Sequence, residues 1–161
     1  MRRETIGGVA SGRTFQSHDA ILRLVAIAED FSIGRFVDVV ETVLPPDPVV
    51  AALWEAELDR SSDTWDQRKE LWKRYKNVSV SDFPQRDPLT GFIEARNSIA
   101  HGLGGLTRKQ LGKRASATGR LSQANIRLRG ESLVIDAAHV EHCAVVVKAF
   151  IGWLDDKSLG Q

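Results

Sequence analysis

The chain has 161 residues, of which 42% are hydrophobic and 27% charged, and its formal net charge at pH 7 is +1. This composition is typical of a soluble globular protein, and the overall charge gives no indication of nucleic-acid binding. Cys143 is the only cysteine, which excludes an internal disulfide framework. No run looks long and apolar enough to span a bilayer, and the start of the chain lacks the apolar core of a signal peptide. We therefore expect a cytoplasmic protein with no membrane partner.

The first half of the chain predicts three helices after a flexible, glycine-containing lead at residues 1–15. Apolar residues at three- and four-residue spacing predict a long helix over about residues 17–43, which a proline-rich turn ends. A shorter helix follows over about residues 49–59. Thr64 and the glutamine three residues later have capping-box spacing, which predicts a third helix up to about Asn77. Its aromatic residues, Trp65, Trp72 and Tyr75, suit base stacking on RNA or core packing, and their helical spacing favours the core.

The second half predicts two longer helices, one short helix and a hairpin. Asp87 is a good N-cap and Gly102 a good stop for a helix between them. Thr107 predicts a short helix to about residue 115, with a loose segment at 116–122. Alternating polar and apolar residues predict two short strands at 124–128 and 132–135. A long helix should follow over about residues 137–157. The expected fold is therefore mainly all-α: one domain over residues 16–161, an up-and-down bundle of four to five helices with a small β-hairpin inserted before the last helix.

The helix that ends at Gly102 has two predicted faces. One is an apolar stripe of Phe92, Ala95, Ile99 and Leu103. The other is a polar face on which Asn97 and His101 are one turn apart, with Glu94 and Ser98 beside them and Arg96 at its border. RNA can be cut without a metal if an acid–base group handles the protons and a cation stabilises the phosphorane. His101 suits the first role, Arg96 suits the second, and Asn97 can orient the imidazole or hold a phosphate oxygen.

Acid and base are two roles, and this site offers one histidine per chain. A two-fold dimer that brings two copies of the helix together would supply both. Residues 107–130 contain no acidic side chain, which suggests a basic face. We expect RNA binding by cations of this run, namely Arg108, Lys109, Lys113, Arg114, Arg127 and Arg129.

His139, His142 and Cys143 lie close together in the predicted last helix and raise the question of a metal site. The two histidines could share a helix face, but a zinc site needs further ligands at suitable spacing, and none is evident. We expect no metal and no cofactor, and we expect Cys143 to be a buried thiol and not a nucleophile.

The run from Arg96 to Gly102, Arg-Asn-Ser-Ile-Ala-His-Gly, resembles the Arg-Asn-x-x-Ala-His motif of the HEPN superfamily of small helical bundles. The resemblance implies a metal-independent endoribonuclease that cleaves RNA by attack of the 2′-OH. It also implies a homodimer, with the arginine and histidine of both subunits in one cleft. Many members are toxins of toxin–antitoxin systems or effectors of phage defence, so a cognate antitoxin or regulatory protein is a possible partner. The motif assigns the site to Arg96, Asn97 and His101. Glu94 and Ser98 are possible supporting residues, inferred from their place on the polar face of the helix.

Two alternatives stay open. Some HEPN-like domains have become non-catalytic modules for RNA binding, protein interaction or dimerisation. The chain could also be a plain helical regulatory domain, in which Arg96 and His101 only make hydrogen bonds between helices.

Overall fold

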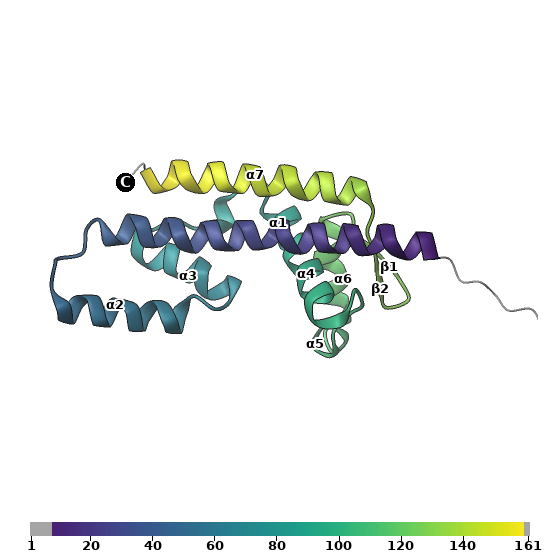
Figure 1. Ribbon diagram of the computed structural model, residues 1–161, viewed down its shortest axis with the longest axis horizontal. Coiled ribbons are helices and arrows are strands. Elements are labelled where there is room, and N and C mark those ends of the chain that lie inside the picture. Colours follow the sequence, from purple (N-terminus) through teal and green to yellow (C-terminus); the bar gives the residue numbers. More distant parts are fainter. Residues whose placement is uncertain (1–7, 160–161) are drawn as a thin grey trace, which may run out of the picture. The chain divides into compact units, whose positions relative to one another are not determined.

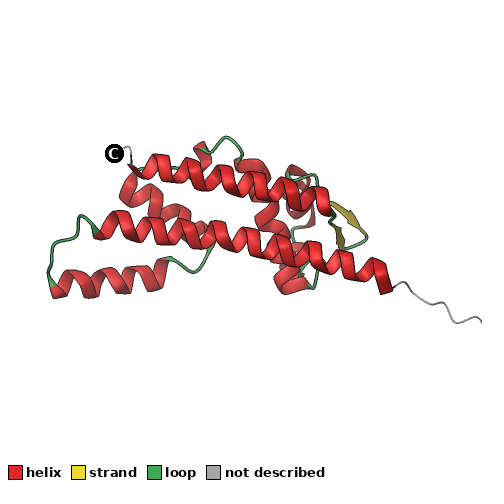
Figure 2. Cartoon of the chain, turned by 45° about the horizontal axis from the view of Figure 1, so that its top comes forward, coloured by secondary structure: helices red, strands yellow, loops and turns green. Residues whose placement is uncertain are grey.

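A computed structural model describes residues 8–159 of the chain, drawn in Figure 1. Within these residues the elements, in chain order, are α1 (Gly8–Glu41), α2 (Pro48–Ser61), α3 (Trp65–Lys76), a 3₁₀ turn η1 (Val80–Asp82), α4 (Arg86–Gly102), α5 (Arg108–Leu111), α6 (Arg114–Gln123), β1 (Arg127–Arg129), β2 (Ser132–Val134) and α7 (Ala137–Leu159). The strands pair antiparallel, with Leu128 opposite Leu133, and form the hairpin before the last helix. The prediction of a mainly helical fold with a small hairpin in this place is confirmed (Figure 2).

Two element predictions need correction. Helix α1 begins at Gly8 and not near Ser17, because a helix that is already nucleated extends at little cost. The described residues hold seven α-helices and not four to five, because the predicted loose segment 116–122 lies inside α6. Residues 1–7 of the predicted flexible lead lie outside the described residues.

The packing divides the chain into two compact units, which are described separately. Unit 1 consists of Met1–Val25 and Asp87–Val147, and unit 2 of Ala26–Arg86 and Lys148–Gln161. Helices α1 and α7 therefore contribute residues to both units. The single domain expected over residues 16–161 stays a prediction.

Unit 2 has an aromatic core, which decides the role of the aromatic residues on α3. Trp72 is fully buried, and its ring centroid lies 5.4 Å from that of Phe36. Its indole Nε1 donates to the main-chain oxygen of Ser32 at 3.1 Å, so the one polar atom of the side chain is satisfied. The ring centroids of Trp65 and Phe150 lie 5.5 Å apart. The prediction of core packing is confirmed for Trp72, whereas Trp65 is half-buried and Tyr75 is 45% exposed at the edge of this core.

Unit 1 contains the predicted motif helix, α4, with α5, α6 and the hairpin (Figure 1). Phe92 and Ala95 are fully buried on α4, and α6 contributes the fully buried Ala117 and Leu121. A Cβ at Gly91 would lie 2.7 Å from the main-chain oxygen of Arg120. Glycine at this position therefore lets α6 pack directly against α4, and this contact positions the second half of unit 1.

The expectation that no segment is long and apolar enough to span a bilayer needs correction. By length and composition helix α7 is able to cross a membrane, with a mean hydropathy of 1.2. Several of its apolar side chains are buried in the protein, among them Cys143 and Val146 in unit 1 and Phe150 and Leu154 in unit 2. Core helices of soluble proteins meet the same criteria of length and composition, so a single helix of this kind is weak evidence for a membrane.

Candidate functional site

Helix α4 is well bounded, although its ends differ in detail from the prediction. It begins at Arg86, one residue before the predicted cap, so Asp87 lies in the first turn, where a carboxylate is favourable. At the other end, Leu103 and not Gly102 adopts the left-handed conformation, with φ of 52°. Leu103 is 97% exposed, and so it does not continue the apolar stripe that the sequence predicts. The Gly104 amide bonds back to the Ser98 oxygen at 3.3 Å and closes the helix end.

The three motif residues lie on the part of α4 that its neighbours leave uncovered. Arg96 and Asn97 are half-buried, and Nη1 of Arg96 donates to Oδ1 of Asn97 at 3.3 Å. His101 is exposed in the last turn, and within the described part of the chain its side chain makes no hydrogen bond or ion pair. The regulatory-domain alternative requires an interhelical hydrogen bond from His101, and the His101 side chain makes none within the described part of the chain. The imidazole is available to a ligand.

Glu94 and Ser98 lie elsewhere than predicted, in a buried network that joins α4 to α5 and α6. The Gln110 amide nitrogen donates to Oε1 of Glu94 at 2.8 Å, and Ser98 Oγ donates to Oε1 of Gln110 at 3.0 Å. Oε2 of Glu94 lies 2.8 Å from Nε of Arg120, which forms an ion pair. Glu94 is 8% exposed and Ser98 is fully buried. Neither side chain is on the open face with His101, so their predicted supporting role at the site is wrong in geometry.

The error has an identifiable cause. A helical wheel treats every polar position as solvent-facing, but α5 and α6 cover the face of α4 that carries Glu94 and Ser98. The capping box of α5 supplied a signal that the wheel did not use. Gln110 is its N3 residue, with Oε1 accepting from the Thr107 amide at 2.8 Å, and this fixes the side chain so that its nitrogen reaches Glu94. The network therefore holds α5 against α4.

The predicted RNA-binding cations are all exposed and lie on elements of unit 1 that contact one another, α5 to α6 and α6 to β1. Nη2 of Arg114 donates to the Gly130 oxygen at 3.0 Å, which ties α6 to the turn of the hairpin. Arg120, the remaining cation of this run, is committed to Glu94. The exposed set is Arg108, Lys109, Lys113, Arg114, Arg127 and Arg129.

The segment between α4 and α5 connects this basic surface to the end of the motif helix. The Leu133 amide donates to the Gly104 oxygen at 2.8 Å, and the Leu106 amide donates to the Glu131 oxygen at 2.9 Å. The hairpin is therefore attached to the residues that directly follow His101. On the other side of this segment, a Cβ at Gly104 would lie 2.5 Å from Cε1 of His18 on α1. Burial lowers the pKa of His18 from its usual value.

Two predictions concern a metal site and the reactivity of Cys143. Among the described residues, no group of three or more His, Cys, Asp or Glu side chains is placed to hold a metal ion. Cys143 is fully buried, and burial raises the pKa of its thiol to about 12. A thiol with this pKa stays protonated at neutral pH, so the prediction that Cys143 is not a nucleophile is supported by its surroundings.

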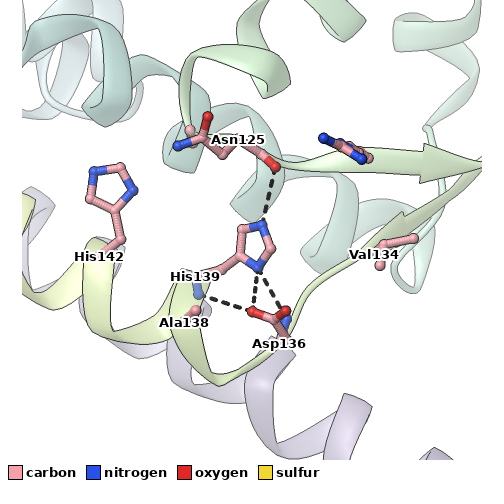
Figure 3. Close-up of a pocket in the computed structure, with 8 residues that line it drawn as sticks. Asn125, Val134, Asp136, Ala138, His139 and His142 are labelled. Carbon is pink, nitrogen blue, oxygen red and sulfur yellow. Dashed lines mark hydrogen bonds and ion pairs between the residues drawn. The ribbon is translucent and has the colours of Figure 1, made fainter.

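A pocket that the sequence did not reveal lies between the hairpin and the start of α7 (Figure 3). His139 fixes its base: Nδ1 lies 2.6 Å from Oδ1 of Asp136, and Nε2 lies 3.2 Å from the main-chain oxygen of Asn125. The hydrogen bond from the His139 side chain lowers the pKa of the Asp136 carboxyl. His139 and His142, the histidines that raised the question of a metal, both line this pocket. No sequence signal pointed to it, because the strands and α7 meet only in the fold.

Comparison with protein-family models, with curated proteins and with solved structures finds no match for this chain. The functional assignment therefore depends on the chain's own residues and their geometry.

Proposed function

We propose that this protein is a metal-independent endoribonuclease of the HEPN type, in which Arg96, Asn97 and His101 form half of an active site completed by a second copy of the chain. The observation that carries the proposal is the exposed imidazole of His101, which has no hydrogen-bond partner among the described residues and lies one turn beyond the Arg96–Asn97 pair. The basic surface of α5, α6 and β1 supports it, because cations beside the site attract the RNA backbone and offset the negative end of the helix dipole.

In the proposed reaction, one His101 accepts the proton of the RNA 2′-OH, and the 2′-oxygen attacks the adjacent phosphorus. The bond from phosphorus to the 5′-oxygen breaks, and the second His101 of the dimer protonates that leaving oxygen. Arg96 stabilises the negative charge that develops on the phosphorane, and Asn97 positions Arg96 through its side-chain oxygen. The products are a 2′,3′-cyclic phosphate and a 5′-hydroxyl. The proposed reaction uses no metal and no cofactor.

The test uses purified protein with structured and unstructured RNAs in EDTA, and it analyses the ends of the products. We expect cleavage with 2′,3′-cyclic phosphate ends, and we expect His101→Ala to abolish it. Arg96→Lys should also lower the rate strongly, because lysine keeps the charge but lacks the forked donors of arginine. Thr118→Ala is the control, since Thr118 is exposed on α6 and lies outside the motif, and its activity should equal that of the wild type.

The alternative of a non-catalytic module that binds RNA or a protein through the same basic face has its own readout. In that case the protein would bind RNA without cutting any RNA tested, and His101→Ala would change neither property. A role as a toxin or defence effector, under the control of an antitoxin or other regulator, would follow from cleavage of cellular RNA. Growth arrest on expression of the wild type, relieved in His101→Ala, would support it.

A further inference from the structure

The pocket between the hairpin and α7 combines apolar walls with a few polar groups. It has a volume of ≈ 690 Å³, and Ala124, Val134 and Ala138 form much of its lining. This volume lies within the range of about 300 to 1,000 Å³ that is typical of pockets for small ligands, which usually have mainly apolar walls and few polar groups. The fold thus provides a pocket of a size that suits a small ligand.

Two polar side chains in the pocket are not used by the described part of the protein itself. The Asn125 side-chain amide and the His142 ring make no hydrogen bond within the described residues. The His142 ring is oriented by an edge-on contact with Phe92, with the ring centroids 5.3 Å apart. His139 differs, because both of its ring nitrogens already face oxygen atoms (Figure 3). Asn125 offers a donor and an acceptor together, which is the combination that pairs with the edge of a nucleobase.

The charged side chains in and beside the pocket indicate where a base and where a phosphate would bind. Asp136 contributes a carboxylate to the lining of the pocket, which disfavours an anion next to it. Arg127 lines the pocket and is exposed on β1, and Arg129 is exposed two residues further along the same strand. Alternate residues of a strand lie on the same face, so both guanidinium groups are on one side of the hairpin. A phosphate backbone along these arginines would leave a base beside the pocket.

We propose that this pocket binds one unpaired base of a single-stranded RNA whose phosphates lie along Arg127 and Arg129. The inference rests on the proposed function in taking RNA as the ligand, and it names the form of that RNA. A base in a duplex is stacked and paired, so it cannot enter, whereas a single strand can turn a base outwards. The pocket would select single-stranded segments and fix which nucleotide is presented to the protein.

The test measures fluorescence anisotropy of a labelled single-stranded RNA 12-mer, in the His101→Ala background to prevent cleavage. Asn125→Gly removes the amide and suits the main chain, because Asn125 has φ of 60°. His142→Phe keeps a ring against Phe92 but removes both nitrogens. A second 12-mer carries abasic ribose at its central positions. We expect each variant to weaken binding of the intact RNA by about three- to tenfold, as expected for the loss of one hydrogen bond, and to bind the abasic RNA as the parent does.

Arg129→Gln is the matched control, since this exposed arginine does not line the pocket, and it should weaken binding of both RNAs equally. Thermal melts identify any variant that fails to fold. The proposal is overturned if folded Asn125→Gly and His142→Phe bind the intact RNA like the parent, if their losses are equal on the abasic RNA, or if a duplex binds as well as the single strand. Cleavage is measured separately with intact His101. Absence of cleavage together with base-dependent binding would refute the nuclease and support the pocket.

Discussion

Gly91 on α4 should be intolerant of any side chain, because α6 approaches it through main-chain atoms. In Gly91→Ala, the new Cβ would lie 2.7 Å from the Arg120 oxygen and 2.8 Å from the Ala124 amide nitrogen. Neither atom can rotate away, so α6 itself must move. Overpacking of this kind costs about 1 to 3 kcal/mol, and we take the upper value because the clash is with main chain. The higher helix propensity of alanine offsets about 1 kcal/mol.

The net expectation is a loss of about 2 kcal/mol in the free energy of unfolding, or a fall in Tm of roughly 4 to 8 °C for a chain of this length. Gly119→Ala is the matched control. Gly119 lies within α6, and a Cβ added there would have no heavy atom within 4 Å, so only the propensity gain of about 1 kcal/mol applies. Urea unfolding followed by circular dichroism measures both variants. Equal or greater stability of Gly91→Ala would refute the close packing of α6 on α4.

Three further predictions concern buried groups of unit 1. Glu94→Ala should lower the free energy of unfolding by about 1 to 3 kcal/mol, which is less than for a fully buried ion pair because Arg120 is partly exposed. Cleavage per folded molecule should stay near the wild-type value, and a large loss of kcat in folded protein would instead give Glu94 a role at the site. Cys143 should react with a thiol reagent at pH 8 only after denaturation, since burial raises its pKa to about 12; fast labelling of native protein would contradict this. His18 has a lowered pKa in the folded state, so the unfolded state binds its proton more readily, and stability should fall as the pH drops through about 6.5 towards the folded pKa. His18→Phe should reduce this loss in melts between pH 7.5 and 5.5, and an unchanged pH dependence would contradict it.

Local signals in the sequence predicted most of the elements. The capping-box spacing at Thr64 and the cap residue Thr107 predicted the starts of α3 and α5, and the structure forms a capping box at each. Strand alternation predicted the hairpin, because the central side chain of each strand faces inwards: Leu133 is 5% exposed and Leu128 is half-buried, whereas their neighbours in the strands are exposed. These features depend on residues close together in the chain, so they can be read without the fold.

Features that depend on contacts between distant residues were missed. The segment 116–122 is rich in small and polar residues and contains a glycine, which is typical of a loop, yet it is helical because α6 packs against Gly91 of α4. Glu94 has a polar side chain, yet it is buried because Gln110 and Arg120 satisfy its carboxylate. The motif residues Arg96, Asn97 and His101 lie on the helix that the sequence predicted, with His101 exposed in its last turn, while their role as a site stays a prediction.

The most direct test of the central claim measures the initial rate of RNA cleavage in EDTA by mixtures of wild-type protein and His101→Ala, unfolded together and refolded at constant total concentration. If one cleft needs His101 from both subunits, only wild-type dimers cut, and the rate should fall with the square of the wild-type fraction. Light scattering should then give twice the protomer mass of 17.8 kDa. A rate that falls linearly with the wild-type fraction would contradict the shared active site, and no cleavage by the pure wild type would contradict the nuclease itself.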